Sequence, residues 1–310
     1  MAELELIGVP FDGFGRPGNQ TRAAATLREA GFVAAFDRHT IARSTELELP
    51  PPDTRRANGS GLVNERALIT MTDSLNSVVA DALRLGRFPV VYGGDCSSLL
   101  GSVTGLKDAV GSAALLFIDG HEDTMPLDTS EDGEAANTEI GLLLGLTGHL
   151  APTELAARLP ALRDESLAML GQRDEAWRLQ FNVGSLRDLG VWLRTVDEVA
   201  SAPSQRAIEA VLHLLGSSVD WWLHVDLDVL DPLEFAAQGL PGVADEPGGL
   251  SWRQLTELTT AAIAMSGCRG LSLAIYDPDQ DPNGVDAARI VQFARDVAAA
   301  LPQRLPSRND

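Results

Sequence analysis

Short, fully apolar segments recur along the sequence, and each runs into a turn rich in glycine or acidic residues. Helical patterns separate these segments, which lie at residues 88–92, 113–118, 166–170, 221–225 and 270–275. Apolar strands that alternate with helices are typical of a parallel sheet covered by helices on both faces. In such sheets ligands bind beyond the carboxyl ends of the strands, which is where the acidic turns fall.

Weaker patterns extend this element order. Residues 4–9 predict a first strand, and the glycine- and proline-containing loop at 13–19 lacks the spacing of a dinucleotide-binding loop. Helical periodicity spans about residues 22–36 and 63–85. A further strand is expected to begin at Val191.

Composition narrows the function. Lys and Arg number 24 against 44 Asp and Glu, so the net charge of −20 argues against nucleic acid and anionic membranes as partners. No run approaches the roughly 18 apolar residues of a membrane helix. With two cysteines and no basic-then-apolar start, we expect a cytoplasmic enzyme with a small-molecule substrate. No linker or repeat divides residues 1–310, so we expect one domain, with a frayed tail at about 302–310.

Acidic side chains cluster after two of the apolar segments. Asp226 and Asp228 follow one segment, and Asp119, His121 and Asp123 follow another. Alternate residues of a strand point the same way, and paired carboxylates repel unless a proton or metal ion lies between them. This hard-donor set suits Mn²⁺, Fe²⁺, Ni²⁺ or Zn²⁺. Five ligands exceed what one small ion needs, so the sequence predicts a two-metal site.

The alternative for each acidic pair is a helix cap or a turn, the commoner role of an Asp-x-Asp at a strand end. Two clusters, one with a histidine at its centre, favour metal binding.

Three motifs, in order, resemble the signatures of the arginase and agmatinase family, the ureohydrolases. Residues 93–97 (GGDCS) are similar to the family's GGDHS, residues 119–123 (DGHED) to DAHxD, and residues 226–232 (DLDVLDP) to DxDxxDP. Residues 8–12 and 276–278 also resemble family landmarks, so the resemblance covers nearly the whole chain.

The resemblance implies a three-layer α/β/α fold with a mainly parallel sheet of about eight strands and two Mn²⁺ ions about 3.5 Å apart. Asp119 and Asp226 would bridge the ions, His121 and Asp228 would complete one site, and Asp123 would serve the other. Asp119, His121 and Asp226 would thereby position a metal-bound hydroxide that attacks an amidine or guanidine carbon. Family relatives form trimers or hexamers, so a homo-oligomer is expected.

One departure from the family concerns the first motif, whose metal-binding histidine is Cys96 here. A thiolate ligand adds a negative charge and shifts selectivity from Mn²⁺ toward softer choices such as Zn²⁺ or Fe²⁺, with Ni²⁺ also possible. Alternatively, Cys96 is a small buried residue and the first ion is weak or absent. A third possibility is a nucleophile whose pKa is lowered at a helix start. Cys268 is expected to pack in the core.

A second departure concerns the substrate. The family's guanidinium-binding glutamate corresponds to Ile275, its proton-shuttling histidine to Asn137, and the last acid of its Arg-Asp-x-Asp motif to Ala176. Losing a bidentate contact to a guanidinium costs about 2–4 kcal/mol. The chain is therefore not expected to be a standard arginase.

Several polar residues remain as candidates for substrate contacts, with solvated loop acids or helix caps as the alternative. They are Asn137, Glu139, Asp174 and Asp277, with Glu122 and Glu175 nearby. His149, His213 and His224 are expected to be surface or helix residues without a catalytic role.

The leading hypothesis is a divalent-metal hydrolase that cleaves a C–N bond in a small amidine, guanidino or amide compound. Two alternatives remain open. One is a catalytically impaired relative that serves as a binding or regulatory protein. The other is an amide hydrolase that uses one ion at His121 and Asp228.

Overall fold

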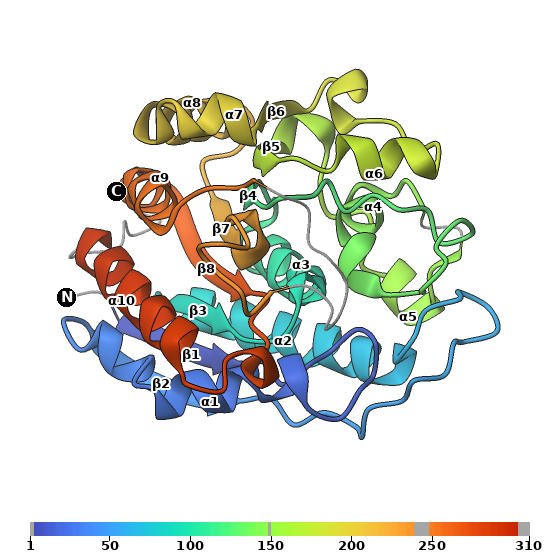
Figure 1. Cartoon of the computed structure of the whole chain (residues 1–310), viewed down its shortest axis with the longest axis horizontal. Coiled ribbons are helices and arrows are strands. Elements are labelled where there is room, and N and C mark those ends of the chain that lie inside the picture. Colours follow the sequence, from blue (N-terminus) through green and yellow to red (C-terminus); the bar gives the residue numbers. More distant parts are fainter. Residues whose placement is uncertain (1–2, 148–149, 239–247, 303–310) are drawn as a thin grey trace.

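One parallel sheet carries the fold. In the computed structural model, which describes residues 3–147, 150–238 and 248–302, eight strands pair in the order β2-β1-β3-β8-β7-β4-β5-β6 (Figure 1). The strands are β1 (Glu3–Gly8), β2 (Thr40–Glu46), β3 (Phe88–Tyr92), β4 (Leu115–Ile118), β5 (Leu167–Gln172), β6 (Trp192–Thr195), β7 (Trp221–Asp226) and β8 (Cys268–Ala274). All seven pairings are parallel, which confirms the expected α/β class.

Two hydrophobic cores lie on opposite faces of the sheet because successive strand residues point to opposite sides. In β4, Leu116 and Ile118 join one core, and Leu115 and Phe117 join the other. Both faces are therefore buried, which is why the central strands are apolar at every position.

Helices cover both faces. The described helices are α1 (Ala23–Glu29), α2 (Glu65–Arg84), α3 (Leu99–Val110), α4 (Glu139–Leu144), α5 (Thr153–Ala156), α6 (Glu175–Gln180), α7 (Val196–Ala200), α8 (Pro203–Leu215), α9 (Trp252–Ile263) and α10 (Val285–Ala300). The core of one face contains side chains of α1, α8, α9 and α10, and the other contains those of α2, α3 and α4. The three layers are visible in Figure 1.

The N-terminal region differs from the sequence analysis in two places. The predicted helix at 22–36 ends at Glu29, because Gly31 adopts a positive φ of 100° and a separate 3₁₀ turn, η2 (Val33–Phe36), follows. The edge strand β2 was not predicted, since most of its side chains are exposed and its sequence, TIARSTE, lacks an apolar run. The expected helix at 63–85 is confirmed as α2.

None of the helices in the described ranges has both the length and the apolar character to cross a bilayer. The tail expected at about 302–310 lies, from residue 303 on, outside the described residues.

Four neighbouring central strands deliver their following loops to one edge of the sheet. These are β3, β8, β7 and β4, and they are followed by the segments that contain Cys96, Ile275, Asp228 and Asp119. From this centre the strand order runs through β1 to β2 on one side and through β5 to β6 on the other. A reversal of strand order of this kind is where open α/β sheets form their ligand sites.

A glycine in β8 is required by the packing of Trp222. Gly270 pairs with Trp222, and a Cβ atom at Gly270 would lie 2.1 Å from Cζ3 of the buried indole. We therefore expect Gly270→Ala to lower the free energy of unfolding by about 1–3 kcal/mol through overpacking.

Urea unfolding followed by tryptophan fluorescence measures this effect. Gly59→Ala is the matched control, because Gly59 is exposed and has no atom within 4 Å of the added methyl group. An equal effect of the two substitutions would contradict the packing argument.

Candidate metal centre

The pairing of β4 with β7 places two carboxylates side by side. Ile118 is level with Val225, so the next residues, Asp119 and Asp226, leave the sheet at the same height. Both side chains are fully buried. The sheet register alone thus brings the first acid of one motif against the first acid of the other.

The other ligand candidates lie beyond the strands, contrary to the strand-alternation argument. β7 ends at Asp226, and Asp228 belongs to a 3₁₀ turn, η8 (Leu227–Val229), in which the Asp226 carboxylate accepts a hydrogen bond from the Asp228 N–H at 2.9 Å. β4 ends at Ile118, and the Asp119 carboxylate accepts the His121 N–H at 2.7 Å. These Asx turns direct the side chains, because a carboxylate that bonds its own backbone two residues on folds the chain back.

Asp119, His121 and Asp228 form the first possible ligand group. Their ligand atoms lie within 4.8 Å of one another. His121 Nδ1 is 3.1 Å from an oxygen of Asp228 and 3.5 Å from one of Asp119. This arrangement matches the carboxylate and imidazole set expected from the sequence.

Cys96 belongs to two further groups. One joins Cys96 with Asp119 and Asp226, and the other joins it with Asp123 and Glu139; both are buried, with ligand atoms within 4.8 Å. Glu139 had been predicted only as a possible substrate contact. Its place beside Asp123 was not foreseeable, because it depends on how α4 packs under the loop that carries Asp123.

Several oxygens of these buried carboxylates have no hydrogen-bond partner. Asp119 Oδ2, Asp226 Oδ2 and both carboxylate oxygens of Glu139 are buried without a hydrogen-bond partner. Burial, and then the neighbouring acids, raise the pKa values of Asp119, Asp123, Asp226 and Glu139 well above their usual range. Such a cluster is costly unless cations neutralise it. The donor set therefore fits divalent metal ions.

His121 and Asp228 form the one charge-compensated pair of the centre in the described chain. Burial alone would lower the pKa of His121, but Asp228 and Asp119 raise it well above its usual value. Burial likewise opposes ionisation of Asp228, but His121 and then Arg173 lower its pKa. An ion bound here would displace the His121 proton, since imidazole ligates in its neutral form.

The surroundings of Cys96 oppose the lowered thiol pKa expected at a helix start. Cys96 begins η3 (Cys96–Ser98), but burial and then Glu139 and Asp123 raise the pKa of its thiol well above the usual value. The thiol donates to the carbonyl of Ala136 at 3.0 Å. Cys96 also packs with Ala136, Ala274 and Ile275 in a small apolar cluster, which we name the apolar wall.

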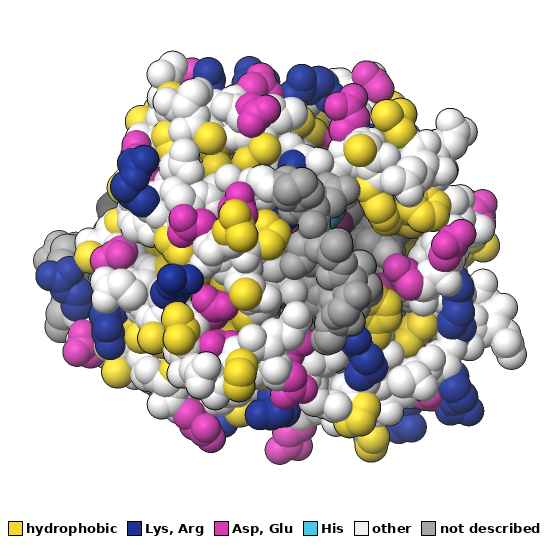
Figure 2. Space-filling view, in the orientation of Figure 1, with side chains coloured by type: hydrophobic (Ala, Val, Ile, Leu, Met, Phe, Trp, Pro, Cys, Tyr) yellow, Lys and Arg dark blue, Asp and Glu magenta, His cyan; other side chains and the backbone are white. Residues whose placement is uncertain are grey.

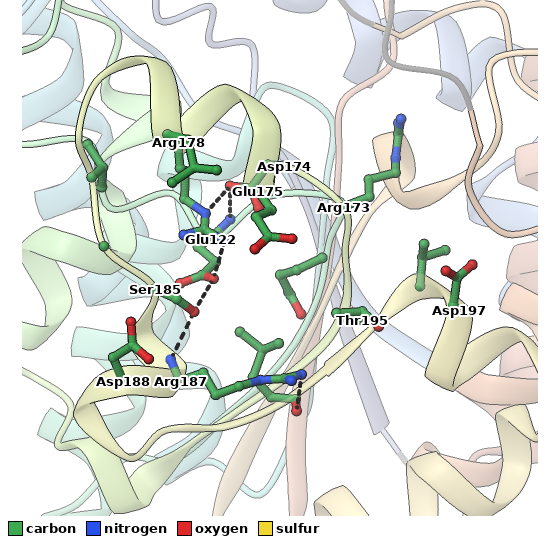
Figure 3. Close-up of a pocket in the computed structure, with 16 residues that line it drawn as sticks. Glu122, Arg173, Asp174, Glu175, Arg178, Ser185, Arg187, Asp188, Thr195 and Asp197 are labelled. Atoms are coloured by element: carbon green, nitrogen blue, oxygen red, sulfur yellow. Dashed lines mark hydrogen bonds and ion pairs between the residues drawn. The ribbon is translucent and has the colours of Figure 1, made fainter.

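A buried ion-pair network anchors the loop between Asp119 and Asp123. Glu122 contacts Arg178 at 2.9 Å and accepts a hydrogen bond from Ser185 Oγ (Figure 3). It also accepts a hydrogen bond from the Leu186 N–H, and its own N–H donates to Asp174. Arg178 also pairs with Asp174 at 3.1 Å. The network lines a cavity of about 620 Å³. Glu122 thus points away from the metal centre while its two flanking side chains, His121 and Asp123, line it.

The remaining substrate candidates have structural partners. Asn137 donates to the Asp132 carboxylate at 3.0 Å, Asp174 pairs with Arg178, and Asp277 accepts the Asp279 N–H at the start of η9 (Pro278–Gln280). Glu175 begins α6 and lines the cavity. For Asp277 the helix-cap alternative therefore describes what the structure shows.

The three histidines that were expected to have no catalytic role lie in different environments. His224 is fully buried in β7, not at the surface, with Nδ1 2.7 Å from Ser272 Oγ, and burial lowers its pKa to about 3. His213 lies on α8 and stacks on Trp192. His149 is outside the described residues. Cys268 is buried, as expected.

Comparison with known proteins agrees with this geometry. The profile of the Arginase family matches residues 2–300. The chain belongs to the arginase family. Among its relatives, the arginase of Bacillus caldovelox is 28% identical over 261 residues, covering 82% of this chain and 84% of the relative. The arginase of Brevibacillus brevis is 28% identical over 257 residues, covering 81% and 82%.

Solved structures of the family share the fold. The arginase of Bacillus caldovelox has a TM-score of 0.83 at 24% identity, covering 96% of this chain and 98% of that one. Formimidoylglutamase from Bacillus subtilis has a TM-score of 0.73 at 18% identity, covering 97% and 87%. Because these sequence identities are only 24% and 18%, the structural similarity shows a shared fold and nothing about substrate.

The anchor network yields a test. Arg178→Met should lower the free energy of unfolding by about 3–5 kcal/mol, because it leaves the Glu122 and Asp174 carboxylates buried without their cation. Urea titration measures the change. Arg163→Met is the control, since Arg163 pairs with Glu165 on the exposed surface and such pairs contribute about 0–1 kcal/mol. Equal losses in the two variants would contradict an anchoring role.

The acidic centre also predicts how stability depends on pH when metal is absent. The pKa values of Asp119, Asp123, Asp226 and Glu139 are raised above the unfolded value of about 4, so the folded chain holds more protons above that pH. Stability of the chelator-treated protein should therefore fall as pH rises from about 5 to 8.

Saturating Mn²⁺ should remove or reverse this slope, because metal binding displaces the same protons. Thermal unfolding at several pH values, with chelator and with Mn²⁺, measures both curves. A metal-free protein whose stability rises with pH over this range would refute the prediction.

Proposed function

We propose that this arginase-family chain is a divalent-metal-dependent hydrolase that cleaves a C–N bond in a small amidine, guanidino or amide compound. The observation that carries the proposal is the set of buried carboxylates with unpartnered oxygens at the ends of β4 and β7. Membership of the family supports it.

Each side chain has a defined task in this proposal. Asp119 is common to the group with His121 and Asp228 and to the group with Cys96 and Asp226, so it would hold ions on both sides. Asp226, level with Asp119, would do the same, and Asp123 would serve the ion farther from His121. When bound, divalent ions, Mn²⁺ by relation to the family, would supply Lewis-acid activation of water near neutral pH.

The surroundings argue for a substrate other than arginine. The apolar wall of Cys96, Ala136, Ala274 and Ile275 stands beside the acids, and it offers no carboxylate to a guanidinium group. Asn137 is bound to Asp132 and has no titratable proton to transfer. Structures with this fold include a formimidoylglutamase and a proclavaminate amidino hydrolase, so the fold accommodates other amidine-like substrates. We also propose that the protein is a homo-oligomer, a trimer or hexamer, by relation to the family.

A substrate and metal screen tests the function. The chelator-treated protein is reloaded with Mn²⁺, Zn²⁺, Fe²⁺ or Ni²⁺ and assayed for urea, ammonia or amine release from guanidino, amidine and amide compounds. We expect turnover with Mn²⁺, and kcat/KM for arginine and agmatine about 30- to 1000-fold below that of the best amidine, the effect of a missing charge-assisted contact.

Asp119→Asn should reduce turnover by at least about 100-fold, since loss of even an outer partner of a metal ligand costs 10- to 100-fold. Asp128→Asn, at an exposed acid of the following loop, is the control. Absence of turnover together with near-zero bound metal would refute the proposal and favour a binding or regulatory protein.

A further inference from the structure

Glu139 is an acid in the centre that none of the three motif segments supplies. It is the first residue of α4, directly after Thr138 and the 3₁₀ turn η4 (Ala135–Asn137), and its side chain has no exposed surface. Its carboxylate lies within 4.8 Å of the ligand atoms of Asp123 and Cys96. The side chain therefore reaches the centre from the start of α4 and not from the end of a strand.

Both oxygens of this carboxylate are buried and neither has a hydrogen-bond partner. The buried carboxylate of Glu122 differs, because it binds Arg178, Ser185 and the Leu186 N–H. A carboxylate in such a position is stable only if it shares a proton with Asp123 or if both acids hold a cation.

Cys96 is less suited to be the ligand. Its thiol donates to the Ala136 carbonyl at 3.0 Å, and an oxygen of Asp123 lies 3.8 Å away. Cys96 also packs against the apolar side chains of Ala136, Ala274 and Ile275, although its sulfur lies within 4.8 Å of ligand atoms of the acids. The sulfur thus has a hydrogen-bond acceptor and apolar neighbours on one side, whereas neither carboxylate oxygen of Glu139 has a hydrogen-bond partner.

We propose that Glu139, and not Cys96, completes the ion site of Asp123, so that this ion is held by oxygen ligands alone. Asp119, Asp123, Asp226, Asp228 and Glu139 together bring five negative charges against four from two divalent ions. A thiolate would add a sixth. Carboxylate ligands suit Mn²⁺, whereas a thiolate would shift the preference of the site further toward Zn²⁺. This inference rests on the proposed metal-dependent function.

The direct test counts ions. Wild-type protein should bind two Mn²⁺ per chain in equilibrium dialysis with elemental analysis, and its electron paramagnetic resonance spectrum should show coupled ions. Glu139→Gln should bind one Mn²⁺ with wild-type affinity, and the second at least about 10-fold more weakly, with loss of the coupling signal.

Glu134→Gln is the matched control. Glu134 is a neighbouring acid with a raised pKa that faces Asp95 and Asp132 and belongs to none of the three ligand groups. It should retain both ions. Two Mn²⁺ of unchanged affinity in Glu139→Gln would overturn the proposal.

Melting temperatures measured with and without metal distinguish a role of Glu139 in folding from a role in metal binding. Without metal, Glu139→Gln removes a buried unpartnered carboxylate, so its melting temperature at pH 8 should equal or exceed that of wild type. With saturating Mn²⁺ the order should reverse, because the variant loses the stabilisation that the second ion supplies. A variant that melts lower in both conditions would indicate a purely structural role and would overturn the proposal.

Cys96 is tested through cobalt. The Co²⁺-loaded wild-type protein should lack a thiolate-to-metal charge-transfer band, and Cys96→Ser should keep both ions. A thiolate band that disappears in Cys96→Ser, with loss of one ion, would overturn the proposal. Wild-type protein that binds no Mn²⁺ would refute the proposed function itself, whereas two ions in both wild type and Glu139→Gln would refute the role of Glu139 alone.

Discussion

Repulsion between buried carboxylates is the constraint on which the centre depends. The register of β4 and β7 sets Asp119 against Asp226 in a layer of the protein that water does not reach, and Asp123 and Glu139 extend the acidic cluster. Among the described residues, His121 and Arg173 bring positive charge to this cluster, and two positive charges are too few to balance its acids. Some of the acids behind the net charge of −20 are thus buried in this cluster. On the visible surface, basic and acidic side chains are interspersed (Figure 2).

The surrounding fold holds this unfavourable cluster in place. Two hydrophobic cores fix the strands, and the Glu122–Arg178–Asp174 network fixes the loop after β4. Because Glu122 points into the ion-pair network, the residues before and after it, His121 and Asp123, line the candidate metal centre. The ion-pair network therefore helps to set the positions of His121 and Asp123 in the candidate metal centre.

The features that could be predicted from the sequence are those that a local residue pattern encodes. Apolar segments predicted the buried strands, and the acids at their ends predicted where a ligand site would form. The edge strand β2 escaped prediction because an exposed strand has no continuous apolar pattern. The positions of Glu139 beside Asp123 and of Arg178 beside Glu122 were not predicted, because both depend on how separate segments of the chain pack together. The turn geometry at Asp228 was also missed, since an Asx turn and a strand share the same alternating acids.

Ile275 adopts an unusual backbone conformation where β8 ends. It is a β-branched residue at a positive φ of 60°, a conformation that costs about 1–3 kcal/mol, and its N–H is held by the Gly94 carbonyl at 3.0 Å. This hydrogen bond to the neighbouring loop helps to hold the backbone in that conformation at the end of β8. The strain places an uncharged, branched side chain in the apolar wall beside the acidic cluster, so this edge of the centre adds bulk there and no charge.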